Sequence, residues 1–236
     1  MSSIEQNIEH ITSQIESAQQ KCGRPRESVQ LLAVSKTKPL EAILDAAQCG
    51  QRRFGENYVQ EGVDKVIHFN QSHPTLDLEW HFIGPIQSNK TRLVAEHFDW
   101  VHTIDRAKTA QRLNDQRPDA MEPLQVLIQV NTSGEQSKSG ISGDELFTLA
   151  ELISTLPNLT LRGVMSIPAN VADYQAQRAE FDKLALLKQQ LSEKYSQIDT
   201  LSMGMSGDME AAIHAGSTMV RIGTAIFGAR DYANKP

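Results

Sequence analysis

Lys36 is the residue whose position most clearly suggests a chemical role. It follows an apolar run at residues 31–34 and precedes a turn that contains Pro39. An amine at the end of a buried strand loses part of its hydration, which lowers its pKa and makes it a nucleophile toward aldehydes and ketones. Lys36 is therefore a candidate for Schiff-base formation. The alternative is a solvated lysine at a strand end, because most lysines are exposed.

Four residues in the C-terminal part of the sequence have the types that bind a phosphate: Ser206, Arg221, Gly223 and Thr224. Residues two apart share one face of a strand, so Arg221 and Gly223 point the same way. Gly223 would let an anion approach the backbone N–H groups, and Thr224 adds a hydroxyl. Ser206 is either the N-cap of a short helix or a hydroxyl donor to the anion. Each residue has a structural explanation singly, but together they predict a phosphate site.

Asn57 and Ser166 end two further apolar runs, where a side chain can reach a ligand. His81 and His102 lie inside such runs, and each is either an acid–base group or a core histidine. None of the seven histidines has H-E-x-x-H or another metal-ligand spacing, and two cysteines cannot build a four-thiolate site. We therefore expect no metal.

The elements that position these residues are short apolar runs alternating with amphipathic stretches. Eight runs read as buried strands, at residues 31–35, 53–57, 79–84, 100–104, 124–130, 161–166, 200–205 and 219–224. Helices are expected at 3–21 and 174–195, and Ser142 with Glu145 fits a capping box before a third. No linker or low-complexity segment divides the chain, so residues 1–236 are expected to form one domain.

Eight strand–helix alternations predict parallel pairing with right-handed crossovers, and a closed (β/α)8 TIM barrel needs ~250 residues. The competing doubly wound sheet carries a G-x-G-x-x-G fingerprint, which follows none of the eight runs. In a barrel the chemistry lies at the C-terminal ends of the strands. A nucleophilic lysine after the first strand and a phosphate site after the last two predict pyridoxal 5′-phosphate (PLP), which carries an aldehyde, a phosphate and a pyridine nitrogen.

The charge balance restricts the partners of the protein. Lys and Arg total 23 against 29 Asp and Glu, giving a formal net charge of −6. This balance argues against a protein that binds nucleic acid or anionic membranes. No apolar run approaches the ~18 residues that span a bilayer, and the N-terminus does not resemble a signal peptide. We therefore expect a cytoplasmic protein.

Five segments in order along the chain resemble the YggS/PROSC family of PLP homeostasis proteins. They are VSKT at 34–37, FGENY at 54–58, WHFIGPIQSNK at 80–90, SMGMS at 202–206 and VRIGT at 220–224, and the likeness extends from about Ile4 to Tyr232. The resemblance implies a barrel of the alanine-racemase N-terminal type with an extra N-terminal helix. It also implies a set of roles: a Schiff base on Lys36, a phosphate held by Ser206, Gly223 and Thr224, Arg221 facing the pyridine nitrogen, and Asn57 and Ser166 lining the pocket.

The same resemblance implies a protein that binds, buffers or delivers PLP in vitamin B6 and amino-acid homeostasis, without established catalytic activity. Barrel relatives that racemise amino acids use a second domain to supply a tyrosine and close the pocket, whereas this sequence ends soon after its eighth strand. We therefore expect an open cofactor face, which disfavours carbanion chemistry. An arginine beside the pyridine nitrogen also makes the ring a poorer electron sink.

Two alternatives stay open, a weak PLP-dependent racemase that uses His81 or Tyr58 as its acid–base group and a cofactor-free Schiff-base aldolase of a phosphosugar. We expect a monomer whose partners are PLP and apo forms of PLP-dependent enzymes.

Overall fold

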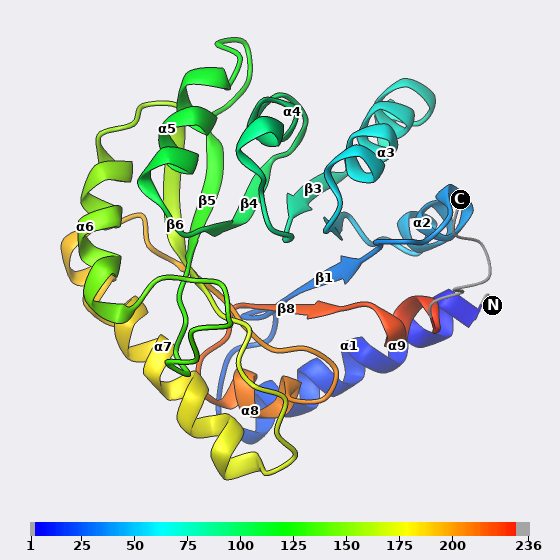
Figure 1. The fold of residues 1–236 in the computed structure, drawn as a ribbon. Coiled ribbons are helices and arrows are strands. Elements are labelled where there is room, and N and C mark those ends of the chain that lie inside the picture. Colours follow the sequence, from blue (N-terminus) through cyan, green and yellow to red (C-terminus); the bar gives the residue numbers. More distant parts are fainter. Residues whose placement is uncertain (1–2, 230–236) are drawn as a thin grey trace.

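A computed structural model describes residues 3–229. Eight parallel strands close into a barrel in sequential order, with β8 paired to β1 (Figure 1). The strands are β1 (Gln30–Val34), β2 (Arg53–Glu56), β3 (Glu79–Phe82), β4 (Trp100–Ile104), β5 (Leu124–Gln129), β6 (Leu159–Met165), β7 (Thr200–Ser202) and β8 (Met219–Ile222). The predicted (β/α)8 barrel is confirmed. Seven of the eight strands begin and end within two residues of the bounds expected from the sequence, and β7 ends three residues earlier than expected.

Helices surround the ring of strands (Figure 1). They are α1 (Ser3–Lys21), α2 (Leu40–Gln48), α3 (Val59–Ser72), α4 (Thr91–His97), α5 (Ala107–Gln116), α6 (Gly143–Ser154), α7 (Tyr174–Lys194), α8 (Met209–His214) and α9 (Thr224–Phe227). The extra helix α1 has the predicted bounds and packs beside α8 and α9. The capping box is also confirmed: Ser142 Oγ accepts from the backbone N–H of Glu145, whose carboxylate accepts from the N–H of Ser142.

The main hydrophobic core lies between the strands and the helices. Alternate strand residues such as Phe54, Trp80 and Val126 point outward into it and are fully buried. The opposite faces of the strands fill the barrel interior, where the described residues form two small apolar clusters, Leu32 with Ile83 and Met219, and Trp100 with Leu127 and Met165. Much of the interior is therefore left to polar side chains, and these carry the site described below.

The C-terminal segment, on which the expectation of an open cofactor face depends, lies outside the described residues from position 230 onward. Within residues 3–229, no helix is both long enough and apolar enough to cross a membrane. No three His, Cys, Asp or Glu side chains of that part of the chain come together in a way that could hold a metal ion.

Candidate cofactor site

Lys36 lies at the barrel mouth, by which we mean the C-terminal ends of the strands with the loops that follow. Leu32 and Val34 of β1 face the interior, where they pack with Ile83 and Met219. The alternation of the strand leads from these two residues to Lys36, which is half-buried in the first turn after β1. The structure thus places this lysine where the sequence predicted it.

The backbone on both sides of Lys36 is held by helix α3. Lys65 Nζ donates to the carbonyl oxygen of Ser35 at 2.8 Å, and Glu61 Oε1 accepts from the backbone N–H of Thr37 at 2.5 Å. These are the two peptide units that flank Lys36. Thr37 has a φ of 64°, a left-handed conformation that costs a non-glycine residue energy and needs such support.

The amine of Lys65 is itself part of a buried charged group that we call the Lys65 cluster (Glu56, Glu61 and Lys65). Lys65 Nζ lies 2.5 Å from Glu56 Oε1 and 2.8 Å from Glu61 Oε1. Glu56 points outward from β2 toward α3 and is completely buried. Burial raises the pKa of Glu56 to about 7, although the charge of Lys65 lowers it in part.

Arg221 lies inside the barrel, on the inner face of β8. Its guanidinium donates through Nη1 to Ser202 Oγ at 2.6 Å and through Nη2 to the carbonyl oxygen of Ser166 at 2.9 Å. Its backbone N–H donates to the carbonyl of Gly204, in the loop after β7. Burial lowers the pKa of Arg221 to about 10, so the side chain is still charged at neutral pH.

Ser202 contacts both Arg221 and a histidine inside the barrel. His102 Nδ1 lies 2.9 Å from Ser202 Oγ, and His102 Nε2 lies 2.8 Å from His81 Nδ1. His81 Nε2 then lies 2.7 Å from Glu79 Oε1. We call Glu79, His81, His102, Ser202 and Arg221 the interior network. Burial lowers the pKa of both histidines, that of His102 well below its usual range, so both are neutral near pH 7.

Two polar atoms at the mouth are buried without a hydrogen-bond partner among residues 3–229, Asn57 Oδ1 and Ser166 Oγ. Asn57 follows β2. A β-carbon on Gly84 would come within 2.1 Å of the backbone carbonyl oxygen of Asn57, so the loop after β2 contacts the loop after β3. Asn57 also lines a cavity of about 400 Å³ together with Ile83 and Gln129. Because buried polar atoms are normally paired, these two are positioned to bond with a ligand.

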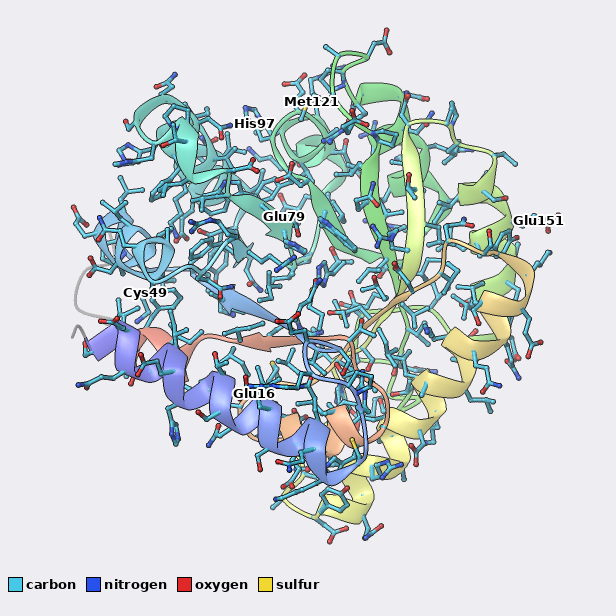
Figure 2. All side chains as sticks on the ribbon, turned by 180° about the vertical axis from the view of Figure 1, so that it is seen from behind. Glu16, Cys49, Glu79, His97, Met121 and Glu151 are labelled. Atoms are coloured by element: carbon cyan, nitrogen blue, oxygen red, sulfur yellow. The ribbon has the colours of Figure 1, made fainter. Side chains whose placement is uncertain are left out.

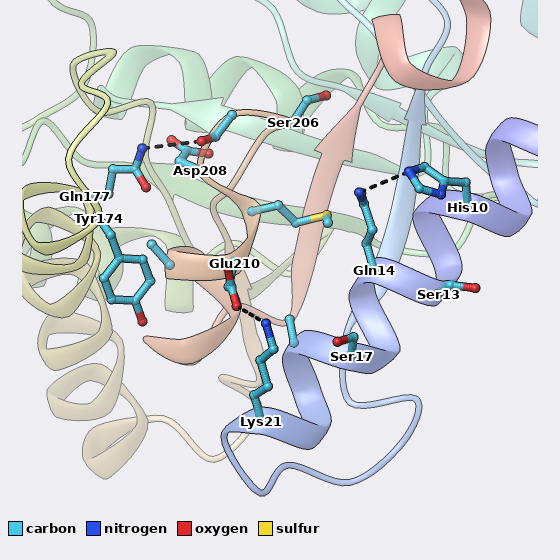
Figure 3. Close-up of a pocket in the computed structure, with 14 residues that line it drawn as sticks. His10, Ser13, Gln14, Ser17, Lys21, Tyr174, Gln177, Ser206, Asp208 and Glu210 are labelled. Carbon is cyan, nitrogen blue, oxygen red and sulfur yellow. Dashed lines mark hydrogen bonds and ion pairs between the residues drawn. The ribbon is translucent and has the colours of Figure 1, made fainter.

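The predicted phosphate residues lie on neighbouring loops, because β7 pairs with β8. Gly223 packs against the end of β1, where a β-carbon would stand 3.3 Å from Val34. Thr224 opens α9 and is exposed, as is Ser206 in the loop after β7. Ser206 lies at the edge of a second cavity, of about 520 Å³, between α1, α7 and α8 (Figure 3).

One alternative for Ser206 is wrong. The helix after this loop, α8, begins at Met209, and its N-cap is Asp208. The carboxylate of Asp208 accepts the backbone N–H of Met205 at 2.7 Å, so it orders the loop from within. The N-cap is thus two residues later than the sequence suggested, and the Asp208 side chain makes no capping hydrogen bond to α8.

Some residues of this site carried no signal in the sequence. Glu61 and Lys65 form an i, i+4 pair, which is usually a solvent-exposed feature of a helix. Ser202 could have been found, since alternation places it on the inner face of β7 beside the buried Leu201. Lys38, two residues after Lys36, donates to the carbonyl oxygens of Gly228 and Ala229.

Comparison with known proteins agrees with this architecture. The family model "Alanine racemase, N-terminal domain" matches residues 6–231. The chain is 78% identical over 233 residues to the pyridoxal phosphate homeostasis protein of Vibrio cholerae, covering 99% of each chain. It is 59% identical over 235 residues to the protein of the same name from Escherichia coli K12, covering 100% of both.

Among solved structures, PipY of Synechococcus elongatus with PLP bound superposes with a TM-score of 0.81 at 34% sequence identity, covering 95% of this chain and 100% of that one. The match therefore extends over nearly the whole barrel, in sequence as well as in fold. On these grounds the chain belongs to the family of pyridoxal phosphate homeostasis proteins, which share the barrel of the alanine racemase N-terminal domain.

Proposed function

We propose that this protein binds PLP at the barrel mouth through a Schiff base with Lys36, and that it buffers or delivers the cofactor rather than using it for catalysis. Three features at the C-terminal ends of the strands carry the proposal: the half-buried Lys36 after β1, the charged Arg221 on β8, and the unpaired buried atoms of Asn57 after β2 and Ser166 after β6. Residues 1–236 would form one PLP-binding domain. The PLP-bound PipY neighbour and the names of the close relatives support the choice of ligand.

The residues at the mouth fit the groups of this cofactor. PLP supplies an aldehyde that condenses with amines and a ring that withdraws electrons. Arg221 has only donors, so it would face the pyridine nitrogen and leave that nitrogen unprotonated. Asn57 Oδ1 and Ser166 Oγ would contact the remaining polar edge of the ring.

The phosphate would be held by Ser206, Gly223 and Thr224. The hydroxyls of Ser206 and Thr224 are exposed and so available to an anion, and Gly223 has no side chain to block its approach.

Formation of the Schiff base needs little from the protein beyond position. The Lys36 amine attacks the aldehyde carbon, a C=N bond forms, and water leaves with the carbonyl oxygen. The Lys65 cluster fixes the peptide units next to Lys36, which reduces the conformational freedom that binding would otherwise have to remove.

The environment of the two suggested acid–base residues supports a role other than catalysis. Both ring nitrogens of His81 are engaged inside the barrel, with His102 and with Glu79. Tyr58 is half exposed in the loop after β2. A racemase needs an acid–base group that faces the reacting carbon in a site shielded from water. Neither residue is held in that way.

Borohydride reduction followed by peptide mapping tests the assignment of Lys36. Hydride adds to the carbon of the C=N bond and water supplies the proton to nitrogen, so the cofactor becomes permanently attached. We expect the label on the peptide with Lys36, and its loss in Lys36→Ala. Lys38→Ala is the matched control, because Lys38 is two residues away and its amine donates to the carbonyl groups of Gly228 and Ala229. A label on another lysine would refute the assignment.

A panel of amino acids incubated with the same sample tests the absence of catalysis. Steady racemisation or transamination that disappears in Lys36→Ala would establish the enzymatic alternative.

We further propose that the protein acts in the cytoplasm as a monomer and passes PLP to apo forms of PLP-dependent enzymes. Light scattering measures the oligomeric state. Reactivation of an apo-enzyme, compared with and without a dialysis membrane between the two proteins, measures whether transfer needs contact.

A further inference from the structure

The interior network connects the barrel mouth with the opposite end of the barrel. Arg221 lies near the C-terminal end of β8, whereas Glu79 is the first residue of β3. Figure 2 labels Glu79 among the strands, while Cys49 and Glu151 lie toward opposite edges of the view. Glu79 also lines a cavity of about 340 Å³ at this end, and its carboxylate lies 3.4 Å from Arg53.

The direction of every hydrogen bond in the network follows from the ionised carboxylate at one end and from the neutral state of the two buried histidines. A guanidinium only donates, so Ser202 Oγ accepts from Arg221 and keeps its hydroxyl proton available for His102 Nδ1. An ionised carboxylate only accepts, so His81 donates from Nε2 to Glu79. Because a neutral imidazole carries one proton, His81 Nδ1 accepts from His102 Nε2, and His102 Nδ1 in turn accepts from the Ser202 hydroxyl. Both histidines are therefore neutral tautomers with the proton on Nε2.

The ionised state of Glu79 is consistent with its surroundings. Burial raises the pKa of Glu79, but the hydrogen bond from His81, together with the charges of Arg53 and Arg162, lowers it below its ordinary value. About one-third of the Glu79 side chain is exposed to solvent in the cavity. A charged carboxylate thus stands at one end of the network and a charged guanidinium at the other.

Arg221 needs such a counter-charge. Among residues 3–229, no ion pair joins Arg221 to a carboxylate, and the charge of Asp208 only partly opposes the effect of burial. A buried cation without a paired anion is costly. A series of hydrogen bonds that all point the same way polarises its members and partly compensates the charge at each end.

We propose that Ser202, His102 and His81 are positioning residues that connect the buried guanidinium of Arg221 to the carboxylate of Glu79 and hold that guanidinium against the ring nitrogen of bound PLP. The connection within the protein stands on the contacts alone, whereas the part that concerns the ring rests on the proposed function. When the network is broken, the guanidinium loses one of its two fixed acceptors, and its contact with the ring becomes less defined.

Nitrogen NMR of ¹⁵N-histidine protein without cofactor tests the tautomers. We expect two of the seven histidines to have a protonated Nε2 and an unprotonated Nδ1, and to keep this state from about pH 6 to about pH 8, where exposed histidines titrate. The signals are assigned with His81→Gln and His102→Gln. A proton on Nδ1 of either residue, or a charged imidazole, would overturn the proposed direction.

The function of the network is tested by comparing His102→Gln with His102→Leu. Glutamine keeps one acceptor and one donor, whereas leucine has neither. We expect His102→Leu and Ser202→Ala to release PLP roughly tenfold faster, about the effect of one hydrogen bond to a charged group, and to shift the absorption maximum of the bound cofactor. His102→Gln should stay near the wild type. Glu79→Gln, which keeps the acceptor but loses the charge, should be intermediate.

The outcomes distinguish a failure of the network's role from a failure of the proposed function. If borohydride labels Lys36 but folded His102→Leu releases PLP with the wild-type rate and spectrum, the positioning role is refuted and the proposed function stands. If the wild type is not labelled at Lys36, the proposed function fails, and the NMR experiment alone decides whether the hydrogen bonds run from Arg221 to Glu79 in the proposed direction. If His102→Leu does not fold, the PLP release rate of Ser202→Ala and the histidine tautomers seen by NMR decide the question.

Discussion

Replacing Lys65 by methionine removes a buried amine while keeping most of the length of the side chain. In the wild type the Lys65 side chain is only 6% exposed and the Glu56 side chain is fully buried, with 2.5 Å between amine and carboxylate. Breaking a buried ion pair by removing one partner costs about 3–5 kcal/mol, because the other charge stays buried. We expect Lys65→Met to lose about this much free energy of unfolding at about pH 8.

The stability loss of Lys65→Met should also depend on pH, because the pKa of Glu56 is shifted in the folded protein. The pKa of Glu56 in the folded protein is about 7, against an ordinary value of 4.5, so the folded state binds a proton more tightly than the unfolded state. The free energy of unfolding therefore falls as the pH rises from 4.5 to about 7, by roughly 3 kcal/mol for a pKa shift of this size. Without Lys65 the folded pKa rises further. The deficit of Lys65→Met should thus grow between pH 5 and pH 8, by up to about 1.4 kcal/mol, the value of one pKa unit, and the rest of the loss should not depend on pH.

Urea denaturation at these two pH values measures the effect, with two control variants. Lys21→Met removes the amine of an ion pair whose side chains are 61% and 49% exposed, and such pairs contribute less than about 1 kcal/mol. Adding Glu56→Gln to Lys65→Met removes the stranded carboxylate, so the extra pH dependence should disappear. A loss in Lys65→Met that is the same at both pH values, or no larger than that of Lys21→Met, would refute the reasoning.

Three further variants probe the mouth. Gly84→Ala places a β-carbon within 2.1 Å of the carbonyl oxygen of Asn57, so it should cost about 1–3 kcal/mol in urea denaturation and weaken PLP binding; wild-type stability would contradict the close contact. Ser166→Ala removes a hydroxyl with no partner among residues 3–229, so stability should change by less than about 0.5 kcal/mol while PLP affinity, measured by absorbance titration, falls several-fold; unchanged affinity would exclude a contact. Arg221→Met should release PLP at least about tenfold faster than wild type, through loss of a charged donor, and an unaltered release rate would argue against a ring-facing role.

The sequence alone was sufficient for the barrel, for helix α1 and for the capping box at Ser142. These features depend on local patterns: apolar runs of strand length, helical periodicity, and a serine three residues before a glutamate. The alternation of side chains along a strand also predicted that Arg221 and Gly223 share one face, and the position of Lys36 between an apolar run and a turn predicted its place at the barrel mouth. Such properties are encoded within a few neighbouring residues, so they can be recognised without a fold.

The interior network and the Lys65 cluster were decided by tertiary structure. His81 meets His102 across 21 residues of sequence, and His102 meets Ser202 across 100, so their hydrogen bonds exist only once the strands close into a ring. Glu61 and Lys65 look like an ordinary surface pair until α3 packs over β2 and buries Glu56 beside them. The burial that raises the pKa of Glu56 and lowers those of the histidines belongs to the packed barrel, because the exclusion of water is a property of the whole fold rather than of any local segment.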